Sequence, residues 1–517
     1  MKHGKLTEFY RAHTAQIILV LIILVSIFFR FYRLNSLPPG LHPDEAANGL
    51  DIFRMIDHHD FRPLYNTNGP REALFFYLQA IFVLIMGNTI LALRMAPAII
   101  GVAGVYAVYL WSKSWFGQRV GLLSAAIMAV NPWAVTITRD GFRASMTPLM
   151  VALTLWAYTL ALRTRKTKWF VIAGGIMSLG MYTYLSFKLF PLALVVIWSF
   201  MELWRKDIVK PLRKQLVISL VAFVIVLIPM GIYAIKHPGD VFARAGGVSF
   251  LEPSLNHGHP IQTLFSTIGK TALMFNVHGD ENYRQNLGGA PELNIFVGLM
   301  FLFGIILCLT RLNKTRYFGL LVVFAVMLLP EVLTAEGIPH ALRAIGAMPE
   351  ALILAAVGID YMLERWYATF PINAAARSAG LGIVVVLLLL SLYQGYEQYF
   401  VAWANSPQTY AAYAEDASSI GHYIIAHPFK GTRYVLIDGY TDKTVFYLTH
   451  YHATYTRIDP SDIANLPKTG AKEFFISNED HDDSIKALRA HFAGGQLSPE
   501  YSTFNGAELY DIYVVGQ

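Results

Sequence analysis

The chain has 517 residues, of which 55% are hydrophobic and only 15% charged, and its mean hydropathy is +0.43. This composition excludes an ordinary soluble globular protein and indicates a polytopic membrane protein. The net charge of +6 is unevenly spread, because the stretch from Val401 onward holds 8 Lys and Arg against 14 Asp and Glu. The basic excess therefore belongs to the apolar part, as expected for cytoplasmic loops, and we expect no nucleic-acid partner.

The apolar part begins near the N-terminus and contains the only cysteine, Cys308. An intrachain disulfide and a Cys-rich metal site are both excluded. The first apolar run, residues 15–29, is not followed by a small-x-small cleavage site, so we interpret it as an uncleaved first helix.

Eleven apolar segments are long enough to span a bilayer, which takes roughly 17–25 residues. They lie at 15–33, 90–112, 119–138, 145–163, 168–185, 187–204, 214–235, 293–311, 316–333, 345–364 and 379–399. Residues 73–86 form a shorter apolar piece. Because a helix rises only about 1.5 Å per residue, this piece is too short to cross a hydrocarbon core of about 30 Å.

The basic loops decide whether residues 73–86 cross. If they do not, five basic loops lie on the side of the N-terminus, as the positive-inside tendency requires. These loops are 113–119, 163–168, 205–214, 311–316 and 364–377. We therefore predict a cytoplasmic N-terminus, with 73–86 as a membrane-dipping helix of the first outer loop.

The last part of the chain changes character. Short β-type runs at 433–437, 453–458, 473–476 and 509–515 alternate with helical patterns at 410–425 and 483–492. We predict a polytopic all-α membrane domain over residues 1–400, with about 11 transmembrane helices, followed by a small extracytoplasmic α/β domain over 401–517.

The same topology places the acid pair Asp44 and Glu45 on the outer face, after a Pro- and Gly-rich turn at 37–43. Carboxylates beside lipid are costly, and a general base at the membrane surface would explain them. The pattern Pro43-Asp44-Glu45 is also typical of a helix start, where acids are favoured. Both interpretations are compatible.

A second outer turn contains Arg139, Asp140 and Arg143. Such a cluster between two spans is either a solvated turn or an anion site, since two arginines flanking an acid suit an anionic ligand.

Further outward cations are Arg71, Lys188 and Arg343. His340 lies three residues before Arg343 and would share a helical face with it, which favours phosphate binding. The alternative is that Arg343 only extends to the membrane interface and has no chemical role.

In the outer loop 236–292, we predict that residues 261–275 form an amphipathic helix on the membrane and that the polar run 278–284 is solvated. The sequence contains no HExxH metal motif and no P-loop.

The order of these features is informative. It is the first span, the run Leu-Pro-Pro-Gly-Leu-His-Pro-Asp-Glu-Ala at 37–46, the dipping helix, two spans and then Arg139-Asp140. This order resembles that of the GT-C glycosyltransferases of the protein O-mannosyltransferase and aminoarabinose (lipid A) transferase group. The resemblance covers roughly residues 1–200 and recurs at Pro339-His340-Ala341-Leu342-Arg343. It does not extend to the C-terminal domain.

The resemblance implies a hexosyl or pentosyl transferase that moves a sugar from a polyprenyl-phosphate donor to a protein, lipid or glycan acceptor at the outer face. It implies Asp44 as the base, Glu45 as its neighbour and Asp140 as the second acid. Arg71 and Arg343 become candidates for the lipid phosphate, joined by Lys188, His340, Arg139 and Arg143. The requirement for a divalent metal stays open, because some related oligosaccharide transferases require one and others do not.

The chemistry fits inverting displacement, since a polyprenyl phosphate is a good leaving group and an acceptor hydroxyl needs a base. The alternative is a transporter or flippase of lipid-linked sugars, but the charges cluster at one face and no internal repeat is evident. A structural or sensory protein ranks last, because it leaves the acids unexplained. We expect a multi-pass protein of a bacterial cell membrane.

Overall fold

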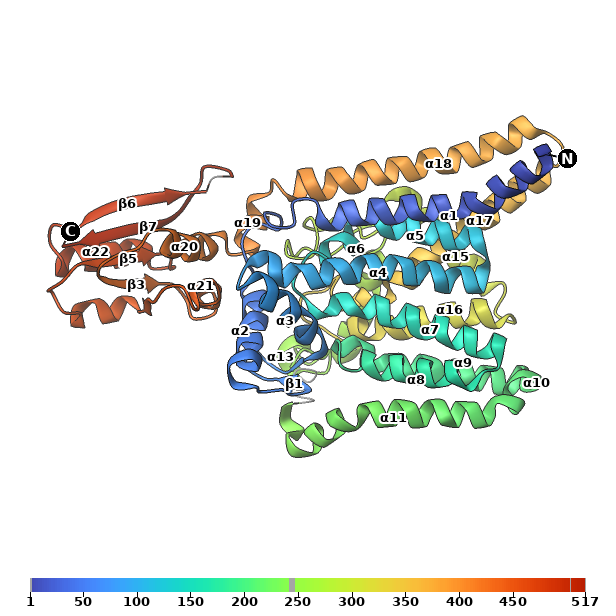
Figure 1. Cartoon of the computed structure of the whole chain (residues 1–517), viewed down its shortest axis with the longest axis horizontal. Helices are drawn as coiled ribbons and strands as arrows, with labels where there is room; N and C mark the ends of the chain where they lie inside the picture. The colour runs from blue at the N-terminus through green and yellow to red at the C-terminus, as the bar shows by residue number, and fades with distance from the viewer. Residues whose placement is uncertain (1, 241–246, 503, 517) are drawn as a thin grey trace. The chain divides into compact units, whose positions relative to one another are not determined.

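The computed structural model describes residues 2–240, 247–502 and 504–516, and it is mostly helical (Figure 1). Within the described residues, eight helical segments are long and apolar enough to cross a membrane, and three shorter apolar helices accompany them. The polytopic membrane fold is therefore confirmed. The count of eleven crossings stays a prediction, although each of the eleven predicted segments contains a helix.

The chain divides into two compact units. Unit 1 comprises Met1–Tyr32, Arg62–Phe75 and Ala96–Trp403, and unit 2 comprises Arg33–Phe61, Phe76–Met95 and Ala404–Gln517. The helices α3 (Leu74–Met86) and α4 (Ile90–Phe116) contribute to both. The predicted boundary at residue 400 stays a prediction, because unit 2 also contains two segments of the N-terminal part.

Unit 1 is a bundle of long helices that run side by side in Figure 1. Apart from the shared α4, its principal helices are α1 (Lys2–Phe31), α5 (Gln118–Val130), α6 (Pro132–Ile137), α7 (Met146–Thr164), α8 (Thr167–Gly180), α9 (Phe190–Trp204), α11 (Arg213–Lys236), α14 (Pro260–Leu273), α15 (Ile295–Leu309), α16 (Thr315–Val332), α17 (Met348–Thr369) and α18 (Ala374–Tyr396). Shorter pieces are η1 (Arg143–Ser145), η2 (Leu185–Leu189), α10 (Lys206–Val209), η3 (Lys210–Leu212), α13 (Pro253–Asn256), η4 (Ala344–Ala347) and the π-helix η5 (Glu397–Trp403).

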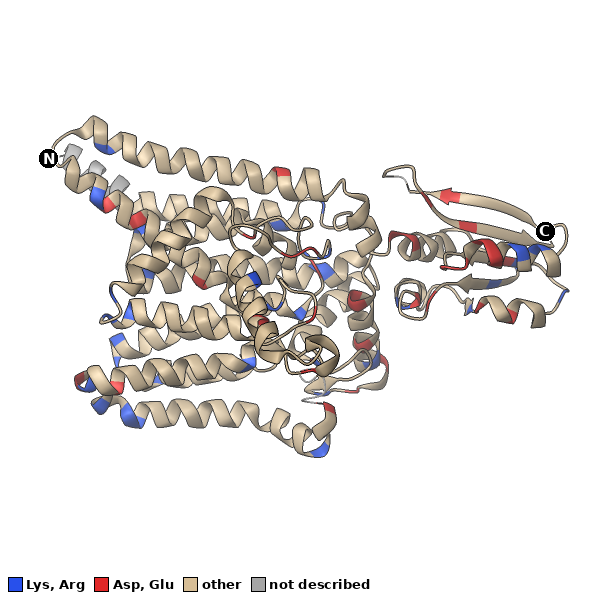
Figure 2. Ribbon diagram, turned by 180° about the vertical axis from the view of Figure 1, so that it is seen from behind, with Lys and Arg blue, Asp and Glu red and all other residues tan. Residues whose placement is uncertain are grey.

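Small residues let these helices approach closely, as is usual in membranes. A Cβ on Gly174 of α8 would lie 2.1 Å from the carbonyl oxygen of Ser219 in α11. One on Gly304 of α15 would lie 2.0 Å from that of Leu354 in α17. Figure 2 shows that these helices carry few charges along their length and that Lys and Arg gather near their ends.

The predicted span 119–138 is divided into α5 and α6. Asn131 ends α5 in an extended conformation, and its side chain accepts a hydrogen bond from the backbone N–H of Ala134 (3.1 Å). Pro132 follows at the first helical position of α6, where its missing N–H costs nothing. Local capping therefore breaks a segment that hydropathy alone makes continuous.

Unit 2 contains a five-stranded sheet with the order β4-β3-β5-β7-β6, in which β3 pairs in parallel with β4 and β5, and β7 pairs antiparallel with β5 and β6. This is the small α/β region that the sequence predicts. Its elements are α19 (Pro407–Ala412), α20 (Glu415–Ala426), β3 (Thr432–Leu436), α21 (Asp442–Thr449), β4 (Thr456–Arg457), η6 (Pro460–Asn465), β5 (Lys472–Ile476), α22 (His481–His491), β6 (Gln496–Tyr501) and β7 (Glu508–Val515).

Successive side chains of β3 point to opposite faces of this sheet, and each face packs in its own hydrophobic core. Val435 joins the cluster built with Ile420 of α20 and Val445 of α21. Leu436 joins the opposite cluster with Leu488 of α22.

The N-terminal segments of unit 2 pack on α21 through the helix α2 (Pro43–His58). A Cβ on Gly49 would lie 2.2 Å from the ring of Tyr447, so this position requires glycine. Phe53 stacks on the rings of Tyr447 (5.2 Å between centroids) and His450 (4.4 Å). The amide of Asn88 donates to the carbonyls of Tyr447, Leu448 and His450. These contacts join α2 and α21 into one packed body.

Candidate functional site

The acid pair lies at the N-terminus of α2, which confirms the helix start that its sequence predicts. His42 caps the helix: its Nδ1 accepts from the backbone N–H of Asp44 (3.0 Å), and Glu45 Oε2 accepts from the N–H of His42 (3.2 Å). This reciprocal capping box fixes the backbone of the helix start and the direction of the Glu45 carboxylate, and the positive end of the helix dipole favours both carboxylates.

Glu45 is fully buried against Arg94, the fifth residue of α4. Arg94 Nε and Nη2 lie 3.2 and 3.0 Å from the two carboxylate oxygens of Glu45. Its Nη1 and Nη2 also donate to the carbonyls of Pro38 and Gly40, each at 2.7 Å. The pair thus fastens the Pro- and Gly-rich turn to α4. Sequence reasoning missed Arg94, although an arginine within an apolar run is itself a signal.

Asp44 differs from its neighbour because its side chain remains 27% exposed. Its Oδ1 accepts a hydrogen bond from the hydroxyl of Tyr440 (2.9 Å), and its Oδ2 lies 4.0 Å from His42 Nδ1. Of the two predicted acids in this loop, Asp44 is therefore the one that a substrate can reach. Tyr440 was not predicted, since it lies almost 400 residues away in sequence.

In unit 1, the cations Arg143 and Lys188 meet at Glu72, which belongs to the short strand β2 (Arg71–Glu72) paired with β1 (Leu64–Tyr65). Arg143 Nε lies 2.9 Å from Glu72 Oε2, and Lys188 Nζ lies 2.8 Å from Oε1. Burial alone would raise the pKa of Glu72, but the two cations outweigh it and hold this pKa below its usual value. Sequence reasoning selected both cations and missed the acid.

Arg71 precedes Glu72 in the same strand, is buried, and donates from Nη2 to Thr67 Oγ1 (3.3 Å). Three predicted cations thus lie in or against this strand: Arg71, Arg143 and Lys188. A group of cations of this kind is suited to an anion.

The turn at 139–143 is buried throughout, which excludes the solvated interpretation. Arg139 donates to the carbonyls of Phe29 and Tyr32, each at 2.8 Å, and to the hydroxyl of Tyr399 (2.9 Å). These contacts anchor the turn to α1 and η5. Asp140, the next residue, is fully buried as well.

We predicted that the polar run 278–284 is solvated, and this prediction is wrong at Asp280. Its side chain is 3% exposed, and its carboxylate accepts from the N–H groups of Asn282 and Ala341, each at 2.8 Å. Burial raises the pKa of Asp280 to about 6, while Arg284 and Arg343 oppose the rise. The loop folds back on itself, which local polarity does not reveal.

His340 lies beside this acid, with its Nδ1 3.7 Å from Asp280 Oδ2, and its backbone N–H donates to Glu331 Oε1 (2.8 Å). Arg343 pairs with Glu336 (3.2 Å) and keeps 17% of its side chain exposed. Residues 341–343 form a turn that leads into η4, so the predicted shared helical face of His340 and Arg343 is absent. The His340 side chain instead lies against the buried Asp280, and that of Arg343 against the exposed Glu336.

Within the described ranges, His481, Glu508 and Asp511 of unit 2 form the single group of three side chains close enough to hold one metal ion. None of the predicted catalytic acids belongs to it. A metal requirement therefore stays a prediction.

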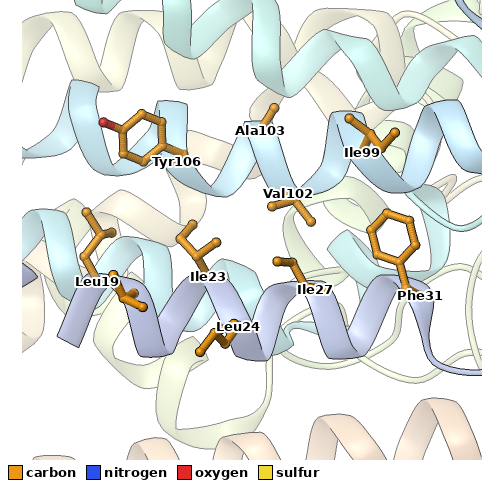
Figure 3. Close-up of a pocket in the computed structure, with 10 residues that line it drawn as sticks. Leu19, Ile23, Leu24, Ile27, Phe31, Ile99, Val102, Ala103 and Tyr106 are labelled. Carbon is orange, nitrogen blue, oxygen red and sulfur yellow. The ribbon is translucent and has the colours of Figure 1, made fainter. Parts of the chain in front are cut away.

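Unit 1 also has an apolar groove of about 760 Å³ between α1 and α4 (Figure 3). Aliphatic side chains such as Leu19, Ile23 and Ile99 line it, and Tyr106 contributes the one hydroxyl. None of the predicted site residues lines this groove.

Residues 70–233 match the family model of the dolichyl-phosphate-mannose-protein mannosyltransferases. The structure is similar to that of ArnT from Cupriavidus metallidurans bound to undecaprenyl phosphate, with a TM-score of 0.59, 14% identity and coverage of 96% of this chain and 97% of that one. The chain has the GT-C fold. The predicted resemblance is confirmed.

Two further proteins are similar to this chain, one in structure and one in sequence. The archaeal oligosaccharyltransferase AglB from Archaeoglobus fulgidus, in complex with an inhibitory peptide and a dolichol-phosphate, gives a TM-score of 0.54 at 14% identity over 95% of this chain and 70% of that one. YycA of Bacillus subtilis (strain 168), a proposed mannosyltransferase, is 24% identical over 171 residues, which are 31% of this chain and 24% of that protein. The match thus spans about a quarter of that relative. Together the comparisons support a membrane glycosyltransferase.

Proposed function

We propose that the protein transfers a hexosyl or pentosyl group from a polyprenyl-phosphate donor to an acceptor hydroxyl at the outer face of the membrane. The family match and the GT-C fold support this proposal, because related structures contain undecaprenyl phosphate or a dolichol-phosphate. The observation that carries it is Asp44, which presents a partly exposed carboxylate at a helix N-terminus and whose backbone is fixed by the capping box at His42.

Asp44 acts as the general base. It takes the proton of the acceptor hydroxyl while the acceptor oxygen forms a bond to the anomeric carbon of the donor. The bond from that carbon to the phosphate oxygen breaks, and its electron pair leaves with the polyprenyl phosphate. A single displacement of this kind inverts the anomeric configuration, and proton removal of this type contributes about 10²–10⁴-fold in rate.

Glu45 is a positioning residue in this scheme. Its carboxylate is engaged by Arg94 and buried, so it holds the loop that presents Asp44 instead of meeting substrate. Asp140 orients the acceptor or the base, as the resemblance implies. Its burial in a turn anchored by Arg139 gives it a fixed position within unit 1.

The departing phosphate is stabilised by cations. Arg143 and Lys188 are the strongest candidates, since both are held at Glu72 with net positive charge remaining. Arg71 in the adjacent strand position, and Arg343 with His340 beside Asp280, complete the proposed donor set. Arg139 contributes as an anchor of the turn.

The topology of the proposal follows from the basic loops. The N-terminus is cytoplasmic, and both the loop with Asp44 and the C-terminal α/β part lie outside the cytoplasm. A divalent metal, where the reaction uses one, would assist by charge stabilisation.

The test is a transfer assay with the purified full-length protein in detergent. Wild type, Asp44→Asn and Asp57→Asn are incubated with a panel of radiolabelled polyprenyl-phosphate monosaccharides and a membrane extract of acceptors. Asp57 is a matched control, because it lies on α2 and is also hydrogen-bonded by a tyrosine, Tyr451. One donor should be consumed by wild type and Asp57→Asn but not by Asp44→Asn. Full activity of Asp44→Asn refutes the base assignment.

A further inference from the structure

The hydrogen bond between Tyr440 and Asp44 assigns a task to the C-terminal part of the chain. We propose that Tyr440, which follows β3, is a positioning residue for the catalytic base and that its hydroxyl aligns Asp44 for proton transfer. This inference rests on the proposed function, because it presupposes that Asp44 is the base. The hydroxyl lies 2.9 Å from Asp44 Oδ1.

The loop that carries Tyr440 is itself fixed. Asp438, directly after β3, accepts hydrogen bonds at Oδ1 from the backbone N–H groups of Tyr440 (2.8 Å) and Thr441 (3.0 Å). Arg457 in β4 donates from Nε to the carbonyl of Ile437 (2.9 Å), just before that turn. The phenol therefore reaches Asp44 from an ordered turn whose conformation does not depend on Asp44.

The opposite partner is equally constrained, because α2 and α21 are joined at the turn that precedes the base. Leu41 donates its N–H to Ser418 Oγ (2.8 Å) and accepts at its carbonyl from Thr444 Oγ1 (2.9 Å). Gly49 allows α2 to lie against the ring of Tyr447. The distance between the Tyr440 hydroxyl and Asp44 is therefore set by packing on both sides.

Other charged and titratable groups lie near this contact. His42 Nδ1 lies 4.0 Å from Oδ2, and Lys443 Nζ lies 4.7 Å from the centre of the Tyr440 ring. Glu45 is paired with Arg94 and so adds little net charge. Among these groups, the Tyr440 hydroxyl donates to Asp44 Oδ1.

This contact has a chemical consequence. A hydrogen bond from the phenol to the ionised carboxylate favours that ionised form, which keeps the base deprotonated at lower pH. The C-terminal α/β part then serves catalysis directly by completing the environment of the base.

Tyr440→Phe tests this inference, with Tyr451→Phe as its matched control. Tyr451 makes the same kind of phenol–carboxylate contact from the end of α21 to Asp57 of α2, at 2.5 and 2.6 Å, away from the base. Both variants delete one hydroxyl and keep the ring. A merely structural contribution should therefore affect both alike.

The readout is the pH dependence of kcat and KM for the donor that wild type consumes. In Tyr440→Phe we expect kcat to fall about tenfold with little change in KM, and the acidic limb of the profile to move up by roughly half to one pH unit, as for the loss of a hydrogen bond of ordinary strength. Tyr451→Phe should keep the wild-type profile.

The possible outcomes separate the two proposals. If wild type and Tyr451→Phe are active, Asp44→Asn is inactive and Tyr440→Phe retains the wild-type profile, the role of Tyr440 is overturned while the proposed function stands. If wild type transfers no sugar from any donor, both proposals fall. Equal losses in Tyr440→Phe and Tyr451→Phe also overturn the positioning role, because they report only weakened packing.

Discussion

Replacing Arg94 by Met tests the claim that a buried ion pair holds the loop of the base. The change removes a guanidinium that contacts both oxygens of Glu45 and the carbonyls of Pro38 and Gly40. Both charged side chains of the pair are fully buried. Breaking such a pair by removing one partner costs about 3–5 kcal/mol, because the other charge is left uncompensated.

The assay is denaturant unfolding of the full chain in detergent, with Arg119→Met as the matched control. Arg119 pairs with Asp360 at 2.7 Å, but its side chain is 47% exposed, so we expect its loss to cost less than about 1 kcal/mol. The double variant Glu45→Leu/Arg94→Met should recover much of the loss, since neither charge is then buried alone. A loss below about 1 kcal/mol for Arg94→Met, equal to that of the control, would refute the reasoning.

Three further predictions address single residues. Asp44→Asn should lower transfer by about 10²–10⁴-fold while thermal stability in detergent stays near that of wild type. Lys188→Met should raise KM for the lipid donor by about tenfold. Because it also removes a cation that lowers the pKa of Glu72, the stability that ionised Glu72 contributes near neutral pH should shrink, and with it the loss of stability as pH falls. The raised pKa of Asp280, about 6 against 3.8 unfolded, means that wild type gains stability as pH falls from about 6 to 4. Asp280→Asn should flatten that part of the stability profile, by about 2–3 kcal/mol, in pH-dependent unfolding.

Features set by short-range sequence were predictable. The start of α2 follows from Pro43-Asp44-Glu45, because capping and dipole effects act within one turn. The long apolar segments could be located for the same reason, since a membrane span depends on its own composition. The strand β6 was missed because it is polar, exposed and contains Pro499, which an edge strand tolerates.

Features that depend on distant residues were not predictable. Arg94 appears in sequence as one charge at the start of an apolar span, and only the fold brings it to Glu45. Asp280 lies in a polar run, yet the loop closes over it and connects it to Ala341. Tyr440 and Asp44 lie far apart in sequence and meet only in the folded unit 2, and no local pattern indicates that meeting.

The proposed reaction breaks the bond between sugar and lipid phosphate. The most direct measurement reconstitutes wild type in sealed vesicles with a doubly labelled polyprenyl-phosphate sugar, and follows both labels over time with acceptor present. We expect the sugar label to move to the acceptor while an equal amount of polyprenyl phosphate is released, and Asp44→Asn to do neither. Movement of the intact labelled lipid across the bilayer, with no release of polyprenyl phosphate, would contradict this expectation and establish the flippase.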